Sequence, residues 1–226
     1  YRAMCCLVTD HAKDVTYDTV TYKGRGSGHY YGYLNGKVTF KDCTFNTKGY
    51  AIHFDRNSGG EVEIDNCVIH GWSSFADSMK GITVNGSTFY GANDEGKNGL
   101  LAKFRPYVQC TFTDCKFSED FLSDATDYCG IDTGAETLVT LNNCSVIKSD
   151  GSASEHKVYE LIDYRDAGTE TGPKATIFEI DAVKNTDGKY TAGTIVTATG
   201  TVEAADGYER KDITTLDGIG KVYEIS

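Results

Sequence analysis

An eight-residue pattern of apolar and polar positions recurs seven times along this chain. The clearest copy is Val38-Thr-Phe-Lys-Asp-Cys-Thr-Phe45, in which the first, third, sixth and eighth residues are apolar or small. Close copies begin at residues 62, 110 and 139, looser copies begin at residues 15 and 82, and the weakest spans 175–182. Such a repeat is typical of solenoids, in which each coil covers the apolar face of the next.

The spacing within each copy indicates two short strands joined at a corner. Apolar residues two apart, such as Val38 and Phe40, share one face of a strand. The step of three from Phe40 to Cys43 breaks this period, so the chain must bend there. The fifth position of the better copies holds residue types that accept left-handed backbone angles at low cost. These residues are Asp42, Asn66, Gly86, Asp114 and Asn143.

A second apolar patch follows most copies, as in Tyr50-Ala-Ile-His-Phe54, and polar, glycine-rich turns separate the patches. Stacked coils would pair these strands in parallel about 4.8 Å apart around a continuous core. We therefore predict an all-β solenoid of about seven to eight coils, with all 226 residues in one domain. Regular coils are expected over 15–182, and an irregular last coil or a cap over 183–226.

These repeats resemble those of the right-handed parallel β-helix, the pectin-lyase-like family, as found in surface proteins of gut bacteria. The resemblance covers about residues 15 to 182. It implies a right-handed solenoid in an extracellular or cell-surface protein. The family includes adhesins, polysaccharide lyases, glycoside hydrolases and phage tail parts, so the fold does not choose among these activities.

Composition narrows the range of partners. The net charge of −11 argues against binding to nucleic acid or anionic lipid. The chain has no apolar run long enough to predict membrane insertion. It begins at Tyr1 rather than Met, so we expect a piece of a larger surface protein, and the sequence leaves the oligomeric state open.

The eight cysteines follow the repeat. Four of them share the sixth position with Val20 and Ile180, and a residue type that alternates with valine acts as a small hydrophobic group. These four are Cys43, Cys67, Cys115 and Cys144. We expect buried, free thiols. Because no Cys-x-x-Cys or paired-histidine motif is present, neither a metal site nor a cofactor is predicted.

Two segments resemble catalytic motifs only in part. Asn185-Thr-Asp-Gly188 matches one motif of polygalacturonases, but none of that family's further motifs follows it. Lys103-Phe-Arg-Pro106 offers basic groups without the pattern of pectate lyases. We expect a turn at 185–188 and predict no catalytic residue. A lyase or hydrolase remains the alternative function, and a structural stalk is a third possibility.

The leading hypothesis is a non-catalytic binding module that uses a lateral face of the solenoid. If Ile52 and Phe54 point into the core, His53 and Asp55 point outward, and the same count applies on other coils. The resulting stripe of aromatic and charged groups suits a host protein or a glycan; the family resemblance suggests an immunoglobulin or a mucin. The predicted ligand-binding residues are Tyr31, Tyr33, His53, Asp55, Trp72, Lys103, Arg105, Asp163 and Arg165.

Two of these predictions are specific enough to check directly. Trp72 is expected in a loop, either to bind a ligand or to fold over the core. Charge reversal of Lys103 and Arg105 is expected to weaken binding without lowering the melting temperature.

Overall fold

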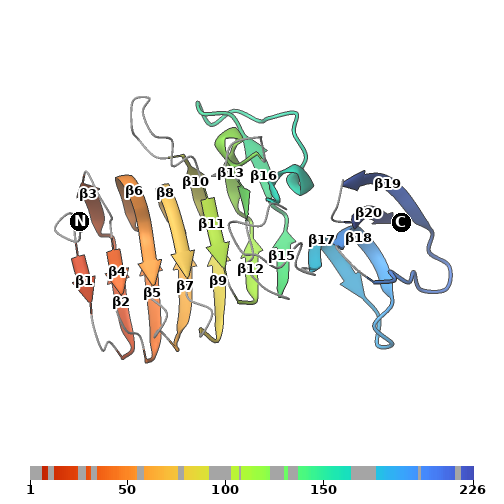
Figure 1. The fold of residues 1–226 in the computed structure, drawn as a ribbon, viewed down its shortest axis with the longest axis horizontal. Coiled ribbons are helices and arrows are strands. Elements are labelled where there is room, and N and C mark those ends of the chain that lie inside the picture. The colour runs from red at the N-terminus through yellow and green to blue at the C-terminus, as the bar shows by residue number, and fades with distance from the viewer. Residues whose placement is uncertain are drawn as a thin grey trace, which may run out of the picture.

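The protein forms a parallel β-solenoid, as the repeat predicts (Figure 1). The computed structural model describes residues 13–24, 35–54, 59–75, 79–91, 103–106, 108–122, 130–131, 137–163, 177–197, 200–216 and 220–226, and the backbone of 7–9 and 29–31. Each coil has three faces, which we name the first, second and third face in the order in which the chain visits them.

The first face is one continuous parallel sheet. Equivalent repeat positions lie side by side, so that Val38 pairs with Val62 and Val62 with Ile82. Its strands, in order, are β2 (Val15–Asp18), β5 (Lys37–Lys41), β7 (Glu61–Asp65), β9 (Gly81–Asn85), β12 (Cys110–Thr113), β15 (Leu138–Asn142) and β17 (Ile177–Lys184).

The second and third faces belong to one bent sheet. The second face contains β3 (Thr21–Gly24), the first parts of β6 (Thr44–Phe54) and β8 (Val68–Phe75), β10 (Thr88–Tyr90), β13 (Lys116–Ser118) and β16 (Ser145–Ile147). The third face contains β1 (Leu7–Thr9), β4 (His29–Tyr31), the second parts of β6 and β8, β11 (Lys103–Pro106) and β14 (Gly130–Ile131). At Gly71 the bend is so tight that a Cβ atom would lie 2.3 Å from the Gly49 carbonyl oxygen.

The predicted one-residue corner between the first and second faces is confirmed. All five fifth-position residues have left-handed backbones: φ is 51° at Asp42 and at Asn66, 54° at Gly86, 55° at Asp114 and 50° at Asn143. The corner side chains also form hydrogen bonds between neighbouring coils. The Asn66 amide donates to the Asp42 carboxylate, and the Asn143 amide donates to the Asp114 carboxylate.

The regular part of the solenoid has about three turns rather than the seven to eight coils predicted. The first face continues beyond them, and the described residues of the third face there are the two-residue strand β14 and the bridge between Ile131 and Ile162. Short 3-10 helices, η2 (Glu119–Phe121) and η3 (Val158–Leu161), follow the second-face strands there.

The weakest repeat copy, 175–182, does not follow the predicted register. Val139 pairs with Phe178 and Leu141 with Ile180, so Phe178 is buried (3% exposed) while Ile177, expected to point inward, is 42% exposed. The alternation of strand residues fixes this parity once the pairing with β15 is set.

After β17 the pairing becomes antiparallel. The strands β18 (Tyr190–Thr197), β20 (Gly220–Ile225) and β19 (Arg210–Leu216) continue the first-face sheet, and lie in Figure 1 at the end opposite the N-terminus. Residues 185–188 form the turn between β17 and β18, as predicted. There the Asn185 side-chain oxygen accepts hydrogen bonds from the N–H groups of Asp187 and Lys189.

The described cysteines are free, and their positions confirm the expected buried thiols. Four are buried and Cys144 is half-buried, while Cys5, Cys6 and Cys129 lie outside the described residues. The thiols also have a polar role that the pattern does not reveal. The Cys67 thiol donates to the Asp65 carbonyl at 3.3 Å, and Ser87, in the same position, donates to the Asn85 carbonyl at 2.9 Å.

Candidate functional site

The outward side of the third face brings together several of the predicted binding residues. His53 on β6 pairs with Ser74 on β8, and Ser74 pairs with Arg105 on β11. The neighbouring positions Ile52 and Phe104 are fully buried in the core. The predicted alternation of inward and outward side chains therefore holds for His53 and Arg105.

Trp72 is the centre of this group. Its ring stacks on Tyr50 of the preceding coil, with centroids 4.6 Å apart, and the Arg105 guanidinium of the following coil lies 5.6 Å from its centroid. His53 packs edge to face against Tyr50 at 4.7 Å. We call Tyr50, His53, Trp72 and Arg105 the aromatic cluster; all four side chains are half-buried.

Two features of the aromatic cluster differ from expectation. Trp72 lies within strand β8 rather than in a loop. Tyr50 was missed because counting by twos from Ile52 places it inside, whereas the pairing of β6 with β8 shifts register between Tyr50 and Ile52. A β-bulge of this kind reverses the direction of the side chains that precede it.

Lys103 and Asp163 do not face solvent, so this part of the prediction is wrong. Both side chains are only 1% exposed, and the Lys103 amine lies 3.3 Å from the Asp163 carboxylate. Gly130 pairs with Lys103 in the sheet, and a Cβ atom on Gly130 would lie 2.7 Å from the Asp163 Cβ. The missing side chain thus leaves room for an ion pair that joins distant coils.

The remaining predicted residues are only partly placed. Tyr31 lies in β4 opposite Phe54, whose side chain points into the core. Tyr33, Asp55 and Arg165 lie outside the described residues.

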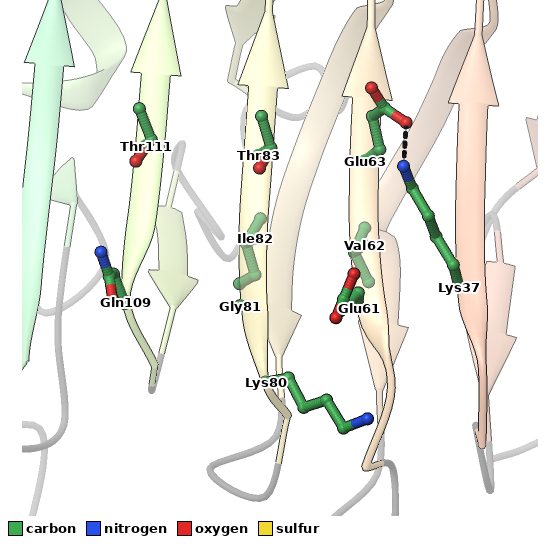
Figure 2. A pocket seen from close by; sticks show the side chains of 10 residues that line it. All are labelled: Lys37, Glu61, Val62, Glu63, Lys80, Gly81, Ile82, Thr83, Gln109 and Thr111. Atoms are coloured by element: carbon green, nitrogen blue, oxygen red, sulfur yellow. Dashed lines mark ion pairs between the residues drawn. The ribbon is translucent and has the colours of Figure 1, made fainter.

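The first face carries a second feature, which the sequence did not single out. A shallow hollow of about 200 Å³ lies on the outer side of β5, β7, β9 and β12. Figure 2 shows its side chains, with the Lys37 amine 2.7 Å from the Glu63 carboxylate. This hydrogen bond raises the pKa of Lys37. The lining residues are Lys37, Glu61, Val62, Glu63, Lys80, Gly81, Ile82, Thr83, Gln109 and Thr111.

The described residues contain neither a cluster of metal ligands nor a helix that could span a membrane. No three His, Cys, Asp or Glu side chains gather there as a possible metal site, and none of the helices described there has the length and apolar character of a membrane span. Comparisons with protein-family models, curated proteins and solved structures gave no match for this chain.

Proposed function

We propose that this chain is a non-catalytic binding module of a bacterial cell-surface or secreted protein of the pectin-lyase-like β-helix type. It engages a protein partner through the aromatic cluster on the third face. The observation that carries this proposal is the stack of Tyr50, Trp72 and Arg105 across three successive coils. Tyrosine, tryptophan and arginine are the residue types that dominate the energetics of protein interfaces.

The geometry of the stack favours a protein over a sugar at this face. Sugars stack on an uncovered aromatic ring, but Tyr50 and Arg105 occupy the two sides of Trp72. A protein partner can instead pack against the ring edges and accept hydrogen bonds from the guanidinium. Because the stack is already formed, binding immobilises few side chains.

The test is binding of purified immunoglobulins and mucins, the partners that the family resemblance suggests, measured by biolayer interferometry. We expect Trp72→Leu to weaken binding by about thirtyfold, which corresponds to a hot-spot loss of about 2 kcal/mol. Tyr90→Leu is the matched control, because Tyr90 is a half-buried aromatic residue of the second face, stacked on His70 at 4.7 Å. Equal effects of the two substitutions would contradict the proposed site, and binding of neither class of protein would favour a structural stalk.

A further inference from the structure

We propose that the hollow on the first face is a second binding site, for a neutral glycan chain lying along the solenoid axis. It is separate from the aromatic cluster and its chemistry is different. Three features of the hollow support this ligand: the open backbone at Gly81, the charges of the lining residues and the regular spacing of the strands.

Gly81 leaves the strand backbone uncovered at the start of β9. It is the first residue of that strand and follows a bend at Lys80, a place where glycine is common. Its backbone is not left-handed, and the nearest atom to a Cβ built there is the Gln109 carbonyl oxygen at 3.9 Å. Gly71 and Gly130, in contrast, face neighbours closer than 3.0 Å. Apart from the chain neighbours of Gly81, no described residue has an atom closer to its Cβ position than the Gln109 oxygen, so a ligand can approach its backbone closely.

The missing side chain opens the hollow. Gly81 pairs with Glu61 on one side, and the Ile82 N–H donates to the Gln109 carbonyl on the other. Figure 2 shows Gly81 between these two longer side chains, with Thr83 and Thr111 forming the next row. The floor is therefore backbone and the walls are hydrogen-bonding side chains.

The lining residues favour a neutral, hydroxyl-rich ligand. Two lysines, Lys37 and Lys80, balance two glutamates, Glu61 and Glu63, so neither an anion nor a cation gains from the local field. Carboxylates accept hydrogen bonds from sugar hydroxyls, lysines donate to them, and threonine hydroxyls do both. A peptide strand has no edge to join here, because β7 and β9 are each paired on both sides.

The dimensions favour a chain rather than a single small molecule. A hollow of about 200 Å³ is smaller than the usual ligand pocket of about 300–1,000 Å³, so it holds about one sugar ring. Its four strands span about 14 Å at the usual strand spacing. A linear glycan that crosses the strands places successive rings on successive coils, with one ring seated over Gly81.

The test is an NMR titration of the ¹⁵N-labelled chain with cellotetraose, xylotetraose, mannotetraose and maltotetraose, and with tetragalacturonate as the anionic comparison. At least one neutral tetrasaccharide should shift the amide signals of Gly81, Thr83 and Thr111. Gly81→Leu fills the hollow and should weaken that binding at least about tenfold, without lowering the melting temperature because it removes a glycine from a strand. Thr16→Leu, on the exposed side of β2, should leave binding unchanged.

Four results would overturn the proposal. They are shifts caused only by tetragalacturonate, shifts retained in the Gly81→Leu variant, shifts confined to Trp72 and Arg105, and no shift with any neutral sugar. Since the titration contains no protein partner, none of these results bears on the function proposed for the aromatic cluster.

Discussion

At the scale of single residues, the side chain at the sixth repeat position lies in apolar surroundings and also donates a hydrogen bond. The carbonyl two residues earlier accepts a backbone hydrogen bond from the corner of the preceding coil, and the side chain at the sixth position donates a second hydrogen bond to it. Cys67 and Cys115 do this with thiols, and Ser87 does it with a hydroxyl. Cysteine satisfies both requirements because it is small, apolar and a weak donor.

The buried Cys67 thiol should make the stability of the protein depend on alkaline pH. Burial raises the pKa of Cys67 to about 12, from an ordinary value of 9.0. The unfolded chain therefore loses this proton at a lower pH than the folded chain does. The resulting stability is fully present below about pH 9 and is lost as the pH rises through about 12, by up to about 4 kcal/mol.

This dependence can be isolated by comparing the wild type with Cys67→Ser in urea unfolding between pH 8 and pH 11. The serine variant keeps the donor, as Ser87 does naturally, but has no thiol to ionise. We expect the stability difference between the two proteins to change in favour of Cys67→Ser as the pH rises. Parallel pH profiles would refute the assignment.

The corner residue Asn66 offers a second test at this scale. Its φ of 51° suits glycine and asparagine but is strained for a β-branched residue. Asn66→Gly should change the free energy of unfolding by less than about 1 kcal/mol, since Gly86 occupies the same corner naturally. Asn66→Val should cost about 2 kcal/mol or more. Chemical denaturation measures both, and similar losses would show that the corner does not depend on backbone angle.

At the scale of strands, the buried pair of Lys103 and Asp163 ties β11 to the segment that follows η3. Lys103→Met should cost about 3–5 kcal/mol, because it leaves the Asp163 carboxylate buried without this amine. Lys103→Met combined with Asp163→Leu should recover most of that loss. Lys37→Met is the control, since its exposed pair with Glu63 is worth less than about 1 kcal/mol. A small loss in the Lys103 variant would contradict this account.

The burial of Lys103 also changes how the binding site can be tested. Charge reversal there would place two carboxylates together inside the protein and lower the melting temperature, contrary to the sequence-based expectation. Arg105 remains suitable for charge reversal, because its guanidinium lies against Trp72 in a half-buried stack.

Strands with a regular repeat were predictable, and the exceptions have local causes. The columns of Val38 and Phe40 predicted the first face, because a period of two leaves one parity to the core. Tyr50 was missed because a register shift is not visible in the pattern. Lys103 was misplaced because residues that cover a sheet face come from distant segments, here Asp163. The hollow at Gly81 was not predicted because its lining residues come from four strands that are far apart in the sequence.

At the scale of the whole molecule, β17 joins two kinds of sheet. It pairs in parallel with β15 and antiparallel with β18, so the edge at which the first face would otherwise end is covered (Figure 1). Covering such an edge prevents unwanted pairing with other chains. The inward positions of the repeat are buried in the core. The outward positions are therefore the ones that can contact a partner.

The separation of inward core positions from outward binding positions is tested most directly by substituting two neighbouring residues of one strand, Phe104 and Arg105. The melting temperature and the affinity for the protein partner are measured for each variant. Phe104 is fully buried, so Phe104→Leu should lower the melting temperature by several degrees, in line with a loss of about 1 kcal/mol, and leave affinity unchanged. Arg105→Glu should lower affinity at least about tenfold with the melting temperature nearly unchanged. Unchanged affinity in Arg105→Glu, or lost affinity in a folded Phe104→Leu protein, would contradict the account.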